Sequence, residues 1–198
     1  FDRYRQGFAR LGFETPKTFR SVFDDRHLPL PLPEGIESRR EGEFWIGVAP
    51  FAKHEGKIYP LDRSESLVAR LSQREDCRVF LMGGGGEEAD LLGGWAEKYP
   101  RVVSLAGKRL GFAVELSMMS RMTLVVSMDS ANMHLASMAG TPVVSVWGQT
   151  HPYAGFLGWR QSKENIIQLS DLSCRPCSIF GNKPCYRGDY ACMQELSV

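Results

Sequence analysis

The sequence lacks the features that would place the protein within a membrane or on nucleic acid. No apolar run approaches the roughly 18 residues that a membrane-spanning helix needs, and the first residues do not open a signal peptide. The formal net charge is only +1, so the composition does not indicate a nucleic-acid partner. These absences favour a cytoplasmic protein, and they still allow a peripheral contact with a membrane.

Cysteine is scarce outside one short segment. Of five cysteines, four fall near the end of the chain, at Cys174, Cys177, Cys185 and Cys192, while Cys77 stands alone in an apolar segment and is expected to be a buried small hydrophobe. Without a secretory signal, clustered cysteines indicate metal binding or free thiols before disulfides. The four are a candidate structural zinc site. The second pair lacks the C-x-x-C spacing of a zinc ribbon, so the alternatives are reduced structural thiols or cysteines bridged in a crystal.

Two familiar ligand-binding signatures are also missing. No Asp-x-Asp motif is present to hold a catalytic metal, and the run Gly83–Gly86 does not spell G-x-G-x-x-G because position 88 is Glu. Glu87 and Glu88 would also place two negative charges in the first helical turn, where a phosphate would sit. We interpret these glycines as a tight turn, with a direct phosphate role as the weaker alternative.

The chain divides into three parts by composition. Residues 1–43 form a lead-in with a short helix near residues 1–11 and an extended Leu-Pro stretch at residues 28–33; the start without Met reads like a linker from a missing N-terminal domain. Residues 44–170 form the main domain, and residues 171–198 form a Cys-rich tail.

The main domain alternates buried strands with amphipathic helices. Solid apolar runs, each followed by a helical pattern, predict a parallel sheet with helices on both faces, which is an α/β Rossmann-like fold. The predicted strands are residues 44–49, 78–82, 102–105, 123–127 and 142–147, and the predicted helices are residues 61–71, 87–99, 111–120 and 131–139. Ligands of such sheets bind beyond the carboxyl ends of the strands.

The loop after the fourth strand is the best phosphate candidate. Ser130 is a suitable N-cap, and no acidic residue follows it in the first turn, so free backbone N–H groups and the helix dipole favour an anion. Asp129 would repel a phosphate, and it is better placed to cap the helix or to accept hydrogen bonds from sugar hydroxyls. The alternative is an ordinary capped helix with His134 buried.

Two further loops hold charged candidates. Lys53 and Lys57 follow the first strand, where a lysine can meet a diphosphate as a point charge, although a solvated surface lysine is the simpler interpretation. Glu115, on the third predicted helix, would accept hydrogen bonds from ribose hydroxyls if it faced the cleft.

Together these segments resemble glycosyltransferase family 9, which contains the ADP-heptose:lipopolysaccharide heptosyltransferases. The resemblance covers roughly residues 44–198, and the Cys-rich tail also looks like tails of that family. Four stretches carry it: residues 50–60, residues 80–84, residues 105–116, and residues 129–152, which begin Asp-Ser-Ala-Asn-Met-His and end Trp-Gly-Gln-Thr-His-Pro.

The resemblance implies the C-terminal, donor-binding domain of a GT-B enzyme. It implies that Lys57 and the helix start, formed by Ser130, Ala131, Asn132 and Met133, hold the diphosphate, that Asp129 and His134 lie at the donor, and that Glu115 lies near the ribose. Two positions depart from the family pattern. Ala131 replaces the usual Gly and narrows the room for a phosphate, and Tyr59 replaces the usual Trp.

The implied activity is transfer of a heptose or related sugar, with inversion, from a nucleotide-diphosphate donor, ADP-heptose first, to a lipopolysaccharide core acceptor. No cofactor is required for catalysis if helix N–H groups and a lysine stabilise the leaving diphosphate. The general base is expected on the missing domain, so this chain alone should bind donor without turning it over. The enzyme would work in the cytoplasm, at the inner face of the bacterial inner membrane. The alternatives are another GT-B enzyme, such as a nucleotide-sugar 2-epimerase, or a non-catalytic nucleotide-binding module.

Overall fold

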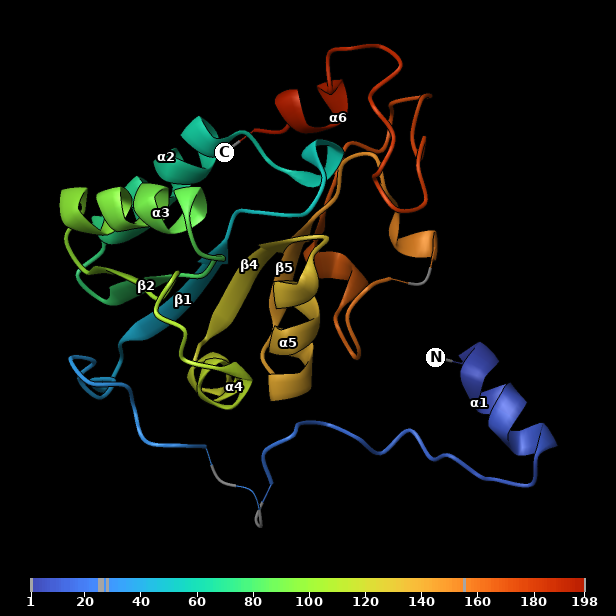
Figure 1. The fold of residues 1–198 in the computed structure, drawn as a ribbon, viewed down its shortest axis with the longest axis horizontal. Coiled ribbons are helices and arrows are strands. Elements are labelled where there is room, and N and C mark those ends of the chain that lie inside the picture. Colours follow the sequence, from blue (N-terminus) through green and yellow to red (C-terminus); the bar gives the residue numbers. More distant parts are fainter. Residues whose placement is uncertain (1, 25–26, 28, 155, 198) are drawn as a thin grey trace.

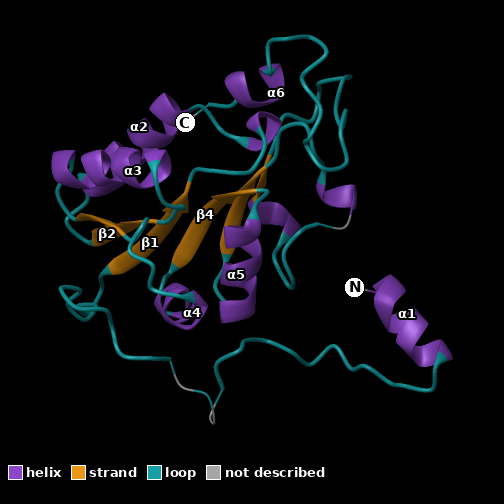
Figure 2. Ribbon diagram, viewed as in Figure 1, coloured by secondary structure: helices purple, strands orange, loops and turns teal. Residues whose placement is uncertain are grey.

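The computed structural model describes residues 2–24, 27, 29–154 and 156–197. Its centre is a six-stranded parallel sheet in the order β3-β2-β1-β4-β5-β6, flanked by helices (Figures 1 and 2). The strands are β1 Phe44–Ala49, β2 Cys77–Leu81, β3 Val102–Ser104, β4 Leu124–Met128, β5 Val143–Val146 and β6 Ile166–Ile167. The helices are α1 Asp2–Arg10, α2 Leu61–Ser72, α3 Glu87–Lys98, α4 Phe112–Ser120, α5 Ala131–Ala139 and α6 Ala191–Gln194, with short 3-10 turns η1 Glu55–Lys57, η2 Pro152–Ala154 and η3 Lys163–Asn165.

The predicted α/β Rossmann-like fold is confirmed, with element ends shifted by one or two residues. Helices α2 and α3 cover one face of the sheet and α4 and α5 the other (Figure 1). Each face has its own apolar core, because a central parallel strand is buried on both sides. Val68 and Trp95 pack on the α2–α3 side, and Met118 and Met133 pack on the α4–α5 side.

The strand order reverses between β1 and β4, which are neighbours in the sheet although β2 and β3 separate them in sequence. The connections from β1 and from β4 therefore leave toward opposite faces, and a crevice opens between them at the carboxyl edge. This arrangement brings the loop that carries Lys57 next to the start of α5.

Helix α5 begins and ends as its sequence predicts. Ser130 is the N-cap in extended conformation, and Gly140 ends the helix at φ 80°, in the left-handed region that favours glycine. A Cβ at Gly140 would lie 3.1 Å from the Cβ of Ser21, so the lead-in passes directly beside this helix end.

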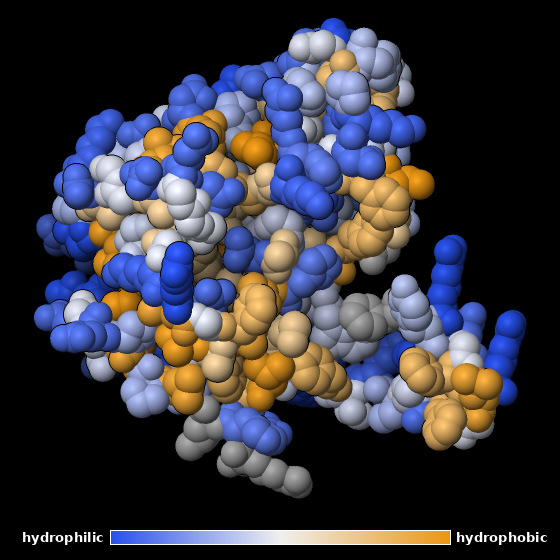
Figure 3. Space-filling model, in the orientation of Figure 1, coloured by the Kyte–Doolittle hydropathy of each residue, from blue (hydrophilic) through white to orange (hydrophobic). Residues whose placement is uncertain are grey.

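The lead-in is partly packed against the main domain. The Val22 N–H donates to the Met138 carbonyl at 2.8 Å, and the Ser117 hydroxyl donates to the Leu30 carbonyl at 2.9 Å. Ile36 is buried in the α4–α5 core. The segment thus runs along the helical face, where Figure 3 shows hydrophobic side chains gathered around α4 and α5. Helix α1 lies away from the sheet and has no buried residue (Figure 1).

The last part of the main domain and the tail each contain an element that the sequence did not reveal. A short strand, β6, joins the sheet edge beside β5, and α6 buries Cys192 and Met193 in a third apolar cluster with Tyr59. Both elements are too short for a periodic pattern to show. None of the described helices is long and apolar enough to cross a bilayer.

Candidate donor site

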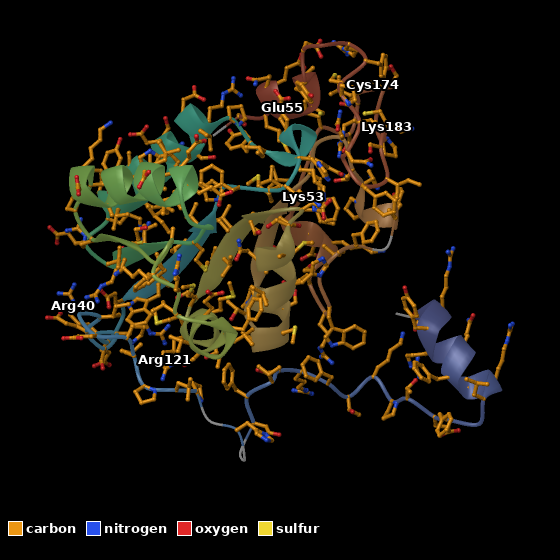
Figure 4. The ribbon with its side chains drawn as sticks, viewed as in Figure 1. Arg40, Lys53, Glu55, Arg121, Cys174 and Lys183 are labelled. Atoms are coloured by element: carbon orange, nitrogen blue, oxygen red, sulfur yellow. The ribbon has the colours of Figure 1, made fainter. Side chains whose placement is uncertain are left out.

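A pocket of about 440 Å³ lies at the carboxyl edge of the sheet, in the crevice beside the strand-order reversal. Three segments of the main domain meet there: the loop after β1, the glycine turn after β2 and the start of α5. The tail closes the remaining side. The lining residues are Phe51, Ala52, Lys53, Lys57, Gly83, Gly84, Glu88, Asp129, Ser130, Ala131, Asn132, His134, Phe156, Ile179 and Phe180. Figure 4 shows Lys53 at the strand ends, below the tail that carries Cys174 and Lys183.

A buried ion pair forms the floor of the pocket. The Lys57 Nζ lies 2.9 Å from Asp129 Oδ2, and the two side chains are only 15% and 5% exposed. The Thr150 hydroxyl donates to the same Oδ2 at 2.8 Å. A charge pair removed from water is stable only when its remaining hydrogen-bonding groups are also satisfied, which the threonine helps to achieve. Asp129 therefore binds Lys57 and does not cap α5.

The start of α5 is open toward the pocket. Ser130 makes no side-chain hydrogen bond to the first turn, and its hydroxyl lies 3.3 Å from that of Ser127. The first turn holds no acidic residue. Unused N–H groups at a helix N-terminus attract anions through their own donors and through the helix dipole.

His134 lines the pocket and keeps contact with solvent. The alternative that this histidine is buried inside an ordinary capped helix is wrong, because α5 turns this face toward the crevice. Loss of solvation in the pocket wall lowers the pKa of His134, and the Lys57 ammonium lowers it further, while Asp129 acts in the opposite direction. The neutral imidazole is therefore favoured beside the cation.

The glycine run forms a tight turn, as predicted. Gly86 has φ 63°, and the Gly84 N–H donates to Glu88 Oε2 at 2.6 Å. A Cβ at Gly83 would lie 2.9 Å from Leu92 Cδ1, so the glycine permits close packing of the turn on α3. Glu88 faces the pocket, where a carboxylate accepts hydrogen bonds from hydroxyl groups and repels phosphate. From the sequence, Glu88 was expected only to repel a phosphate, and its place in the pocket wall was not predicted.

The remaining predicted site residues fall into two groups. Lys53, Ala131 and Asn132 line the pocket. Glu115 is half-buried in the first turn of α4 and is not among the lining residues, and the Met133 side chain is fully buried in the α4–α5 core. A role for Met133 is thus confined to its backbone, and the ribose contact of Glu115 stays a prediction.

The tail forms one wall of the pocket, which the sequence did not indicate. Ile179 and Phe180 line it, and the rings of Phe180 and Phe156 lie 5.8 Å apart. A Cβ at Gly181 would lie 2.7 Å from Lys57 Cγ, so this glycine rests directly on the lysine stem. Contacts between segments this far apart in sequence have no local signal.

The four tail cysteines have different surroundings. Burial raises the pKa of Cys192 to about 11, and burial together with the neighbouring Cys174 raises that of Cys177. Burial acts in the same direction on Cys185, but backbone N–H groups of the following turn outweigh it and lower its pKa. In the part of the chain that the structure describes, no three His, Cys, Asp or Glu side chains are grouped to hold a metal ion.

Comparison with known proteins gives a consistent result. The family model for glycosyltransferase family 9 (heptosyltransferase) matches residues 8–183, so the likeness begins well before residue 44, where the sequence resemblance placed it. Lipopolysaccharide heptosyltransferase 3 of E. coli K12 is 28% identical over 131 residues, which are 64% of this chain and 36% of the relative. A second E. coli protein of that name is 24% identical over 169 residues, 81% of this chain and 48% of the relative. The chain thus spans less than half the length of these relatives.

Solved structures show the same fold. The E. coli heptosyltransferase WaaC with ADP has a TM-score of 0.63 at 22% identity, over 84% of this chain and 48% of that one. WaaC with ADP-2-deoxy-2-fluoro heptose has a TM-score of 0.61 at 22% identity, over 89% and 53%. Because the family model covers most of the chain and the fold agrees, this chain belongs to glycosyltransferase family 9, the heptosyltransferase family.

Proposed function

We propose that this chain supplies the nucleotide-sugar site of a glycosyltransferase that moves a heptose from ADP-heptose to a lipopolysaccharide core acceptor, with inversion. The observation that carries the proposal is the pocket in which Lys57 and the open start of α5 face one another. The curated relatives are lipopolysaccharide heptosyltransferases, and WaaC was solved with ADP and with an ADP-heptose analogue. These names support the choice of donor and acceptor.

The pocket suits stabilisation of a leaving nucleoside diphosphate. Backbone N–H groups of Ala131 and Asn132 and the Lys57 ammonium are fixed where negative charge would develop, and such preorganised donors can lower a barrier by several kcal/mol. Asp129, His134 and Glu88 would meet hydroxyls of the donor. No cofactor is needed for this chemistry, and we assign the general base to a domain outside this chain.

Titration of the chain with ADP, UDP and GDP by calorimetry tests the proposal, with the Ser130→Glu variant as the probe. We expect ADP to bind best, and the variant to weaken binding about 100-fold because its carboxylate would lie where the diphosphate binds. Ser66→Glu is the matched control, since Ser66 is exposed on α2 outside the pocket. Equal ADP affinity in wild type and Ser130→Glu would contradict the proposal, and preference for another base would change the donor.

The epimerase alternative needs carboxylates and a histidine in one cleft. The sequence alone did not predict such a group. In the structure, Glu88, Asp129 and His134 all line the pocket. Family membership nevertheless favours transfer. The transferase proposal assigns them to donor binding.

We also propose that the tail binds structural zinc through Cys174, Cys177, Cys185 and Cys192. Support comes from their C-x-x-C pair, and among the described residues no three of these side chains already form a metal-binding group. Metal analysis of chain purified without chelator should give about one zinc per chain, lost in Cys174→Ser. A metal-free, folded wild-type chain would leave them as free thiols.

A further inference from the structure

Thr150 lies beneath the pocket without lining it. It is fully buried in the loop after β5, and its hydroxyl donates to Asp129 Oδ2. Its carbonyl accepts a hydrogen bond from Arg175 at 3.1 Å, and Arg175 Nε donates to the Gly148 carbonyl at 2.5 Å. The tail residue Arg175 therefore holds this loop in place. The threonine therefore has a fixed position relative to the carboxylate.

The two groups on Asp129 meet at one oxygen. Lys57 and Thr150 both contact Oδ2, and no described protein group donates to Oδ1. The hydroxyl therefore fixes the position of the oxygen that Lys57 binds, and with it the direction in which the ammonium points. Lysine has three N–H donors and uses one here, so the others remain for an anion in the pocket. The hydroxyl also fixes the carboxylate plane.

We infer that Thr150 is a positioning residue for donor binding: through Asp129 it holds the Lys57 ammonium toward the pocket and leaves Asp129 Oδ1 for a hydroxyl of the sugar nucleotide. The inference rests on the proposed function, because it assumes that the pocket binds a nucleoside diphosphate. Thr150 would thus affect donor binding although it does not line the pocket.

The test measures ADP affinity of three single variants. Thr150→Val keeps the shape but removes the donor, and we expect binding to weaken about tenfold, as for a hydrogen bond to a charged group. Thr150→Ser keeps the hydroxyl, and its ADP affinity should be within about twofold of wild type. Thr141→Val is the matched control, because Thr141 is also buried and donates to the Met119 carbonyl at 2.6 Å, but it lies outside the pocket. It should lower thermal stability without changing ADP affinity.

A second measurement separates positioning from general loosening. In an Asp129→Ala background the threonine has no carboxylate to orient, so adding Thr150→Val should change ADP affinity less than about twofold. The same tenfold loss in both backgrounds, or no loss in Thr150→Val at all, would overturn the inference. If Asp129→Ala does not fold, the contrast of Thr150→Ser with Thr150→Val decides. A wild-type chain that binds no nucleotide would refute the proposed function, a result distinct from these.

Discussion

Replacing Gly56 with alanine is expected to destabilise the fold by about 3 kcal/mol and to weaken ADP binding, because the new methyl group would overlap a buried side chain. A Cβ at Gly56 would lie 2.1 Å from Gln149 Cδ and Oε1. Gln149 is fully buried. Gly56 also directly precedes Lys57, and its carbonyl accepts from the Gln149 N–H at 2.9 Å, so a shift here moves the lysine. Chemical denaturation and calorimetry measure the two effects.

A compensating variant tests whether the overlap is the cause. Gly56→Ala with Gln149→Ala removes the obstructing amide, whose nitrogen and oxygen have no hydrogen-bond partner, and should recover at least about half of the lost stability. Gly94→Ala is the control, since a Cβ at this exposed position on α3 meets nothing within 4 Å. It should be neutral or stabilise slightly. A Gly56→Ala chain as stable as Gly94→Ala would refute the packing argument.

Replacing Arg175 with methionine is expected to detach the tail and to cost about 3 kcal/mol, because four buried or partly buried acceptors lose their donor together. The guanidinium binds the carbonyls of Gly148, Thr150 and Leu169 and the Gln168 side chain. Burial lowers its pKa. Since the tail also covers Lys57, ADP binding should weaken as well.

The cysteines report directly on this detachment. Cys192 is 5% exposed, and burial raises its pKa to about 11, so it should react slowly with alkylating reagents in the wild-type chain. In Arg175→Met we expect its alkylation, followed by mass spectrometry, to be at least about tenfold faster. Arg187→Met is the control within the tail, because Arg187 is exposed and pairs with Asp189 at the surface. Unchanged protection of Cys192 would show that Arg175 does not hold the tail.

The elements of the main domain could be predicted because each is encoded locally. An apolar run such as Phe44–Ala49 predicts a strand that is buried on both faces, and Gly140 followed by Pro142 predicts the end of α5. The edge strand β6 and the four-residue α6 escaped prediction because two to four residues cannot show a period. Their stability comes from neighbours, namely β5 for the strand and Tyr59 for the helix.

The candidate donor site also has features that the sequence predicted and features that it did not. The sequence alone determined the strand-end loops and the types of group in them, because a parallel sheet must bring its carboxyl ends to one edge and a helix start without acidic residues must leave free donors there. Only the tertiary structure decided which groups meet. It placed Lys57 on Asp129 with Thr150 beneath them, turned Glu88 and His134 toward the pocket, left Glu115 outside it, and laid the tail across the lysine. These contacts join loops far apart in the chain, and their distances depend on packing that no local pattern specifies.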